Sequence, residues 1–178
     1  MWRKRRSTID DEERVIKDIE LSRERTMSRA VKLLAAKPRS ISELRERLME
    51  KSWTNRQIID GVIEKLAEYK YLDDEQFARD LAVSKLRQKP QGKRRLKQSM
   101  SQKKLDREIV DQAITAAFEK LPENDLIERA IEKRLRLKGR PETREDIKKF
   151  YDYLLRQGFE YELVISKMRD VSKIESDQ

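Results

Sequence analysis

One pattern occurs three times in this chain and restricts the possible fold more than any other feature. A large apolar residue precedes a helix-capping position, and a second apolar residue follows the cap by four places. The copies are Trp53-Thr54 with Ile58, Leu105-Asp106 with Val110, and Phe159-Glu160 with Val164. In a hydrophobic staple, the residue before the cap packs against the fourth residue of the helix. The pattern therefore predicts three helices that begin in the same way.

The similarity between the copies extends to both sides of the staple. Five apolar positions recur at an offset of 52 between the first two copies and 54 between the last two: Leu44, Leu48, Trp53, Ile58 and Val62; Leu96, Met100, Leu105, Val110 and Ile114; Phe150, Leu154, Phe159, Val164 and Met168. Chance matches in an amphipathic helical chain are the alternative, but five positions in three copies favour a repeat. Repeats of this length indicate stacked supersecondary units. We therefore predict an all-α fold, an elongated array of three tandem three-helix modules.

The predicted organisation is a basic and charged N-terminal extension followed by three modules. The extension covers residues 1–22, the modules cover 23–72, 73–122 and 123–178, and the last module ends in a short polar tail. Residues 1–8 are expected to be disordered, and a first helix is expected from about residue 10 to residue 36. Helix starts are predicted at capping residues: Ser40, Thr54, Asp73 or Asp74, Asp106, Asn124 and Thr143. Gly158 suits the left-handed position that ends a helix.

Composition supports helices without a single thick core. Charged residues make up 43% of the chain and hydrophobic residues 37%, against roughly 25% and 45–50% in ordinary globular domains. Only four Gly and four Pro interrupt it. No segment approaches the roughly 20 apolar residues of a membrane span, and the start is charged where a signal peptide would be apolar. We expect a monomeric cytoplasmic protein without a membrane partner.

The sequence lacks the residues on which most catalytic sites depend. It contains no His and no Cys, which excludes His-based catalysis, thiolate chemistry and most transition-metal sites. Gly92-Lys93 lacks the earlier glycine of a phosphate-binding loop. Asp73, Asp74 and Glu75 are explained better by capping and the helix dipole than by a Mg²⁺ site. We therefore expect neither an enzyme nor a bound cofactor or metal.

Positive charge is concentrated in the middle of the chain. Between Arg79 and Arg107 there are 11 basic residues and two acidic ones, a net charge of +9 that equals the charge of the whole chain. Such a stripe attracts polyanions, and this attraction falls steeply with salt. A solvated helix face on a charge-rich protein is the plainer interpretation. Five aromatic residues beside the module junctions are assigned to core packing in preference to stacking on bases: Tyr69, Tyr71, Phe77, Tyr151 and Tyr153.

The order of several short motifs resembles the RecX family of bacterial RecA regulators. These motifs are Tyr71-Leu72-Asp73-Asp74 with Phe77-Ala78, Pro90-Gln91-Gly92 with Leu96, Lys138-Gly139-Arg140-Pro141, and Leu155-Arg156-Gln157-Gly158-Phe159. The similarity extends from about residue 27 to residue 171. Two departures are Lys70, where the family commonly has Gly, and Lys103-Lys104, where a Lys-Gly pair is usual. A non-glycine residue adopts positive φ only at a cost.

The resemblance implies a regulator, mainly an inhibitor, that lies in the groove of the RecA-DNA filament. It would limit ATP hydrolysis, strand exchange and repressor cleavage, with a role in recombination, DNA repair and the SOS response. Our candidate residues for contact with filament or DNA are basic: Lys85, Arg87, Lys89, Lys93, Arg94, Arg95, Lys97, Arg134, Arg136 and Lys138. Reversing Arg94 and Arg95 to Glu is expected to weaken filament binding without a loss of helix.

A second hypothesis is a DNA-binding protein of helix-turn-helix-like modules that acts by occupying DNA. Three-helix units with a basic central helix fit it. No recognition helix with base-reading side chains stands out, so binding to single- or double-stranded DNA would depend on phosphates and be nonspecific. An enzyme of unknown chemistry is the least favoured interpretation.

Overall fold

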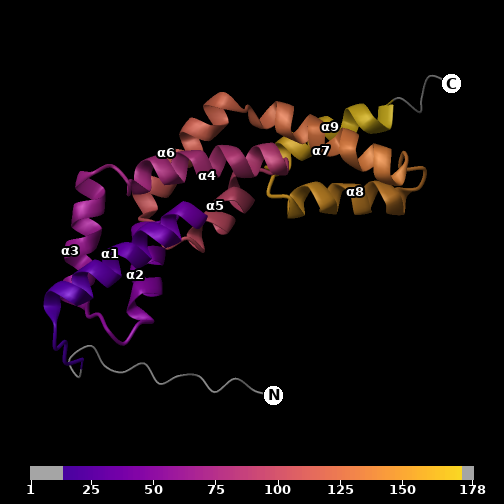
Figure 1. Ribbon diagram of the computed structural model, residues 1–178. Coiled ribbons are helices and arrows are strands. Elements are labelled where there is room, and N and C mark those ends of the chain that lie inside the picture. Colours follow the sequence, from indigo (N-terminus) through magenta and orange to yellow (C-terminus); the bar gives the residue numbers. More distant parts are fainter. Residues whose placement is uncertain (1–13, 174–178) are drawn as a thin grey trace, which may run out of the picture. The chain divides into compact units, whose positions relative to one another are not determined.

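The structure is a computed structural model that describes residues 14–173 (Figure 1). Over this range the chain forms nine α-helices and no strand, which confirms the all-α prediction and the three tandem three-helix modules. The chain divides into two compact units, Met1–Phe77 and Ala78–Gln178. The predicted disordered tail at residues 1–8 lies outside the described residues.

The first unit contains the three helices of the first module. These are α1 (Ile19–Ala36), α2 (Ile41–Met49) and α3 (Arg56–Glu68). Each begins at a side-chain cap, because Asp18, Ser40 and Asn55 accept hydrogen bonds from the third backbone amide beyond them. Their apolar faces form one core: Ala30, Leu33, Leu44, Leu48, Ile59, Val62, Ile63, Leu66 and Leu72.

Two predicted helix starts in this unit are wrong. Helix α1 begins at Ile19 rather than near residue 10, because Asp18 caps it and residues 14–18 are not helical; residues 10–13 lie outside the described range. Helix α3 is capped by Asn55 rather than Thr54. The Thr54 hydroxyl is buried and is hydrogen-bonded to the Thr26 hydroxyl, 2.9 Å away. A tertiary contact therefore occupies the side chain that the local pattern assigned to capping.

The second unit contains the remaining two modules, and they share one hydrophobic core. Helix α4 (Asp74–Gln88), in whose first turn the division between the units falls, is followed by α5 (Lys93–Ser101) and α6 (Arg107–Lys120). The third module consists of α7 (Glu123–Lys138), α8 (Arg144–Arg156) and α9 (Tyr161–Lys173). A single cluster of buried side chains runs from Ala78 to Met168. Neither module encloses a core of its own, as expected for repeats.

The repeated apolar positions are the core positions of the fold. All of them are buried except Trp53, which is 37% exposed, and Leu105, which is half-buried. The side chain before the cap is therefore the variable member of the pattern. It is fully packed only in the third copy, where Phe159 is 3% exposed.

Capping of the helices from α4 onward follows the prediction with one exception. Asp73, Asp106 and Thr143 accept the hydrogen bonds expected of caps. The prediction of Asn124 as a cap is wrong, because α7 begins at Glu123 and Pro122 holds the N-cap position without a side-chain hydrogen bond. Proline has a fixed φ and no amide hydrogen, so it suits the start of a helix.

Left-handed backbone occurs where the two departures from the family pattern lie. Lys70 has φ 61° and Lys104 has φ 54°, and Gly139 and Gly158 also have positive φ. At the end of α3, the Tyr71 amide donates to the Leu66 carbonyl and the Lys70 amide to the Ala67 carbonyl, which is the Schellman arrangement. The turn geometry is thus retained without glycine, at a cost in strain of about 1–2 kcal/mol per residue.

The expected burial of aromatic residues is only partly confirmed. Phe77, Tyr151 and Tyr153 are half-buried, whereas Tyr69 and Tyr71 are 60% and 71% exposed. The prediction of core packing is wrong for these two, because the left-handed turn at Lys70 places them at a bend of the backbone and not on the apolar face of a helix. Among the helices of residues 14–173, none is long and apolar enough to cross a membrane.

Candidate functional site

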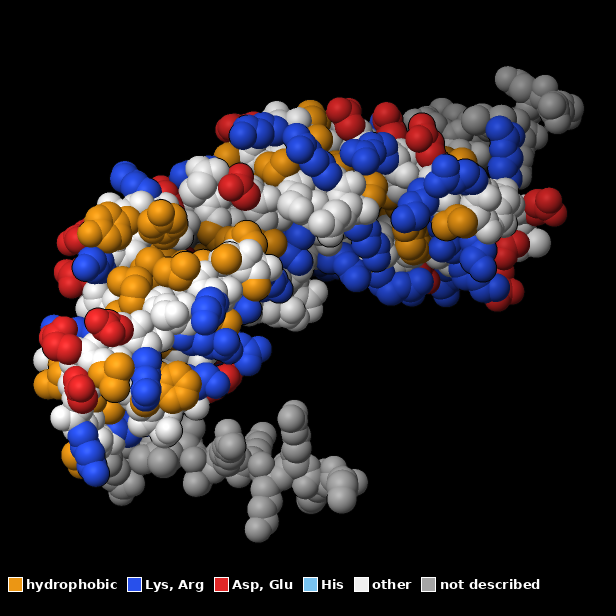
Figure 2. Space-filling model, viewed as in Figure 1, with side chains coloured by type: hydrophobic (Ala, Val, Ile, Leu, Met, Phe, Trp, Pro, Cys, Tyr) orange, Lys and Arg blue, Asp and Glu red, His pale blue; other side chains and the backbone are white. Residues whose placement is uncertain are grey.

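The ten predicted contact residues all lie in the second unit. Lys85 and Arg87 are on α4, Lys89 follows α4, and α5 carries Lys93, Arg94, Arg95 and Lys97. The last turns of α7 carry Arg134, Arg136 and Lys138. Figure 2 shows Lys and Arg side chains gathered on one face of this unit, over α5 and α8. The fold therefore places basic residues from distant segments on a common surface.

Two arginines of α5 join the second module to the third. The Arg94 Nη2 atom donates to the Leu155 carbonyl at 2.9 Å, and the Arg95 Nη1 atom donates to the Arg156 carbonyl at 2.8 Å. Both acceptors are in the last turn of α8, whose carbonyls have no partner within the helix. Cations are favoured at that end by the helix dipole. Arg94 and Arg95 thus have a structural role that sequence reasoning did not foresee.

Two glycines allow the same joint to close. The Gly92 amide donates to the Gln157 carbonyl at 3.0 Å. A Cβ atom on Gly92 would lie 2.1 Å from the Gly158 carbonyl oxygen, and one on Gly158 would lie 2.5 Å from the Arg95 amide nitrogen. Two motifs of the family resemblance, Pro90-Gln91-Gly92 and Gln157-Gly158-Phe159, therefore meet in space. Their role is to bring two backbones into contact.

Lys97 and Arg134 are also engaged within the unit. The Lys97 ammonium group pairs with the Asp111 carboxylate of α6. The Arg134 guanidinium lies 5.1 Å from the ring centroid of Phe150 and 4.5 Å from that of Tyr153, and it donates to the Lys149 carbonyl at 3.4 Å. These contacts attach α5 to α6 and α7 to α8. Substitutions here would disturb packing as well as any contact with a partner.

The other predicted residues are more accessible to a partner. Arg87, Lys89, Arg136 and Lys138 are exposed and Lys85 is half-buried; within residues 14–173, these five have no hydrogen bond or ion pair from their side chains. Lys93 is exposed, with its ammonium nitrogen 5.7 Å from the ring centroid of Phe118. Cations without internal partners remain available for phosphate or carboxylate groups.

A carboxylate lies at the beginning of the basic helix. The Glu123 Oε1 atom accepts a hydrogen bond from the Lys93 amide at 3.4 Å, at the N-terminus of α5. Burial raises the pKa of Glu123 above its ordinary value, and the negative charge of Glu160 adds to this effect, while the Lys93 amide and ammonium group oppose it. Both α5 and α7 begin beside this carboxylate, where helix dipoles favour negative charge.

Sequence reasoning missed the contribution of α8 to the basic face. Helix α8 carries four exposed basic residues, Arg144, Lys148, Lys149 and Arg156, of which Arg156 lies at the joint with α5. Their signal is weak in the sequence because Glu145, Asp146 and Asp152 almost cancel their charge. Lys149 is paired with Glu145 at 2.9 Å, which raises its pKa.

The acidic residues at the start of α4 act as helix-terminus groups. The Asp73 Oδ1 atom accepts from the Gln76 amide at 2.8 Å, and the Asp74 Oδ1 atom accepts from the Ile41 amide, the first of α2, at 2.9 Å. Burial raises the pKa of Asp74 despite that hydrogen bond. In the described part of the chain, no group of three or more potential ligands is arranged to hold a metal ion.

Comparison with known proteins identifies relatives over most of the chain. Models of the first, second and third three-helix domains of RecX match residues 27–66, 73–114 and 122–167. The regulatory protein RecX of Chlorobium limicola is 31% identical over 136 residues, which cover 76% of this chain and 82% of the relative. That of Chlorobaculum tepidum is 29% identical over 139 residues, which cover 78% and 82%.

Solved structures agree on the fold. The crystal structure of RecX from Lactobacillus salivarius superimposes with a TM-score of 0.74 over 85% of this chain and 97% of that one, at 19% identity. A second crystal structure of a regulatory protein RecX gives a TM-score of 0.71 at 20% identity, over 85% of this chain and 73% of the other. At these identities the similarity supports the fold alone.

Proposed function

Because the chain belongs to the RecX family of regulatory proteins, we propose that it regulates RecA, mainly as an inhibitor that binds in the groove of the RecA-DNA filament. In this proposal it modulates ATP hydrolysis, strand exchange and coprotease activity as a cytoplasmic monomer and catalyses no reaction itself. The observation that carries the proposal is the exposed positive charge of the second unit: Arg87, Lys89, Arg136 and Lys138 are exposed and have no side-chain partner among the described residues.

Electrostatics and multivalency support this mode of action. A filament presents the same acidic or phosphate groups at regular intervals, and three tandem modules offer more than one contact to such a partner. Linked weak contacts raise overall affinity without a strong contact at any single site. The free cations contribute long-range attraction that speeds association and declines with salt. Contacts with RecA and contacts with DNA phosphates both use this chemistry.

The first experiment measures DNA-dependent ATP hydrolysis by RecA on single-stranded DNA. The protein is titrated at amounts far too low to cover the DNA. Inhibition at that dose supports action on the filament. Inhibition only near saturation of the DNA supports the alternative function, a nonspecific DNA-binding protein of helix-turn-helix-like modules that occupies DNA. No effect at any dose overturns the regulatory proposal.

A charge-reversal pair tests the surface itself. The variant Arg87→Glu with Lys89→Glu changes two exposed cations that have no side-chain partner in the described part of the chain. We expect at least a roughly tenfold rise in the concentration needed for half-inhibition, because each reversal replaces attraction with repulsion. Lys37→Glu with Lys65→Glu reverses two exposed cations of the first unit and is the matched control. Equal inhibition by both variants would remove Arg87 and Lys89 from the mechanism.

Arg94 and Arg95 are unsuitable for this first test. Their side chains donate to carbonyls of α8, so reversal to Glu would place carboxylates against carbonyl oxygens at the joint between modules. A loss of inhibition in that variant would not separate filament contact from a damaged joint. Urea unfolding of the variant distinguishes the two effects, because only joint damage lowers the free energy of unfolding.

A further inference from the structure

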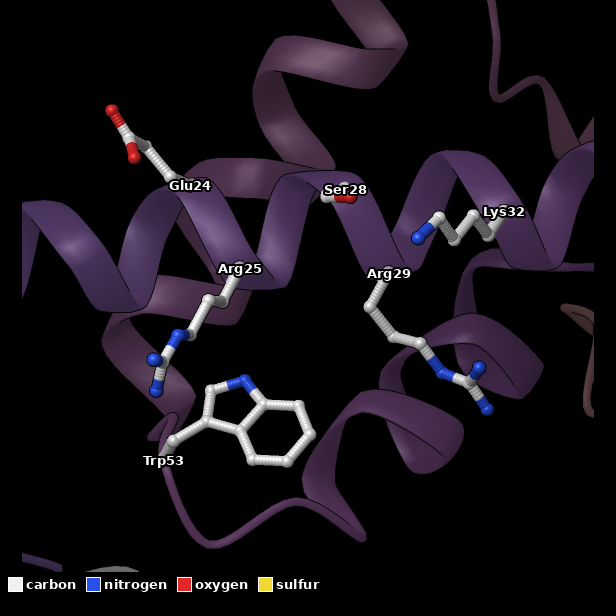
Figure 3. A pocket seen from close by; sticks show the side chains of 6 residues that line it. All are labelled: Glu24, Arg25, Ser28, Arg29, Lys32 and Trp53. Atoms are coloured by element: carbon white, nitrogen blue, oxygen red, sulfur yellow. The ribbon is translucent and has the colours of Figure 1, made fainter.

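An exposed tryptophan lies beside a cluster of cations in the first unit. Trp53 precedes α3 and is 37% exposed. It lines an open depression of about 430 Å³ together with Glu24, Arg25, Ser28, Arg29 and Lys32, all from α1. Figure 3 shows the indole ring below α1, between the side chains of Arg25 and Arg29. The sequence pattern had assigned Trp53 to a helix staple.

Hydrogen bonds from other parts of the first unit stabilise the turn that carries Trp53. The buried Ser22 hydroxyl donates to the Trp53 carbonyl at 2.5 Å, and the buried hydroxyls of Thr26 and Thr54 are 2.9 Å apart. Arg14 donates to three more carbonyls of the turn, those of Met49, Lys51 and Thr54, at 2.9, 3.1 and 3.0 Å. The indole is therefore held on a rigid support, which lowers the entropy cost of binding.

The charge around the indole is predominantly positive. Arg25, Arg29 and Lys32 have no ion pair within the described residues, and Glu24 is the single acidic residue that lines the depression. The Lys51 ammonium nitrogen lies 5.6 Å from the centroid of the Trp53 ring. A ligand that fits here combines a flat aromatic group with negative charge. Both properties occur in a nucleotide whose base is unpaired.

We propose that this depression binds single-stranded nucleic acid, with one unpaired base stacked on Trp53 and the adjoining phosphates paired with Arg25, Arg29 and Lys32. Aromatic side chains next to a basic groove are the usual means of binding single strands without sequence preference. A duplex is not bound in this way, since its bases already stack on one another. The site lies in the first unit and does not involve the basic surface of the second, so the two proposals are independent.

Tryptophan fluorescence provides a direct test. The chain has two tryptophans, Trp2 and Trp53, so Trp2→Phe makes Trp53 the sole emitter in the full-length protein. Titration with an oligothymidylate of about 20 nucleotides, which covers the site sizes of single-strand binders, should quench this emission. The same strand paired with oligoadenylate should leave it unchanged. Binding through another surface would leave Trp53 emission unchanged with both ligands, and that result would overturn the proposal.

Matched variants separate stacking from charge. Trp53→Leu should weaken binding of a labelled oligothymidylate roughly tenfold, within the range for the loss of one stacked base, and Trp53→Phe should restore part of the affinity. Arg25→Ala should weaken binding several-fold and lower the salt slope of binding by about 0.7. Arg23→Ala is the control, because Arg23 lies on the same helix but pairs with Glu20 at 3.1 Å. Circular dichroism confirms that each variant is folded.

Two other results would also overturn the proposal. One is unchanged affinity in Trp53→Leu. The other is equal quenching by polyglutamate, which would indicate an acidic protein partner. Failure of this site is distinguishable from failure of the regulatory function, because inhibition of RecA by the Arg87→Glu and Lys89→Glu variant is measured separately.

Discussion

Trp53 and Phe159 hold the same place in the repeat and differ in almost every tertiary respect. Each precedes the last helix of its module, α3 or α9. Phe159 is 3% exposed and belongs to the core of the second unit, beside the close contact of Gly92 with Gly158. Trp53 is 37% exposed and lines an open depression. The repeat therefore sets where a helix begins, whereas the surrounding elements decide whether the residue before it is buried.

The largest expected effect comes from truncation of these two side chains. Phe159→Ala should lower the free energy of unfolding of the second unit by about 3–5 kcal/mol, since a buried aromatic is replaced by a cavity. Trp53→Ala should lower that of the first unit by about 1 kcal/mol, because much of the indole is already in water. Urea unfolding of the full chain measures both. Equal losses in the free energy of unfolding would show that the exposure of the two side chains does not determine how much each contributes to stability.

A pair of glycine substitutions, one in each unit, tests the same difference in packing and has a smaller expected effect on stability. Gly92→Ala should cost about 2–3 kcal/mol, because its Cβ atom would lie 2.1 Å from the Gly158 carbonyl oxygen and force the joint apart. The φ of Gly92, −81°, suits alanine, so the cost reflects crowding and not backbone strain. Gly61→Ala in α3 is the matched change, because its Cβ atom would meet nothing within 4 Å. It should stabilise the first unit by about 0.5–1 kcal/mol.

The smallest effect concerns the residue that precedes the staple residue in each module: Ser52 before Trp53, Lys104 before Leu105 and Gly158 before Phe159. Lys104 and Gly158 have positive φ, and Ser52, at the corresponding place in the first module, does not. Lys104→Gly should stabilise the protein by about 0.5–1 kcal/mol. The strain energy that glycine relieves in the left-handed conformation exceeds the free-energy cost of the greater conformational entropy that it gives the unfolded chain. Ser52→Gly should destabilise by a similar amount. Lys104→Ala retains the strain and removes the side chain, so stabilisation by alanine would contradict the explanation.

Signals within the sequence were sufficient to predict the helices and the number of modules. These signals are the apolar periodicity at three- and four-residue spacing, the capping residues and the repeat offset, and all of them can be read from the sequence alone. They correctly predicted Ser40, Asp106 and Thr143 as N-caps and Gly158 as a left-handed residue. Local signals failed where a tertiary contact competed for the same side chain, as at Thr54. At the start of α7, the prediction chose Asn124 as the cap, whereas Pro122, two places earlier, holds the N-cap position.

The contacts of the basic and aromatic side chains depend on tertiary packing and could not be predicted from the sequence. The stripe from Arg79 to Arg107 is uniform in sequence, yet Arg94 and Arg95 bond to α8 while Arg87 and Lys89 extend into solvent. The partner carbonyls lie 61 residues away along the chain, and no periodicity encodes such a pairing. Likewise, α1 supplies the cations beside Trp53 through packing alone. Charge and aromaticity are properties of residues, whereas availability to a partner depends on which neighbours the fold brings within a few ångströms.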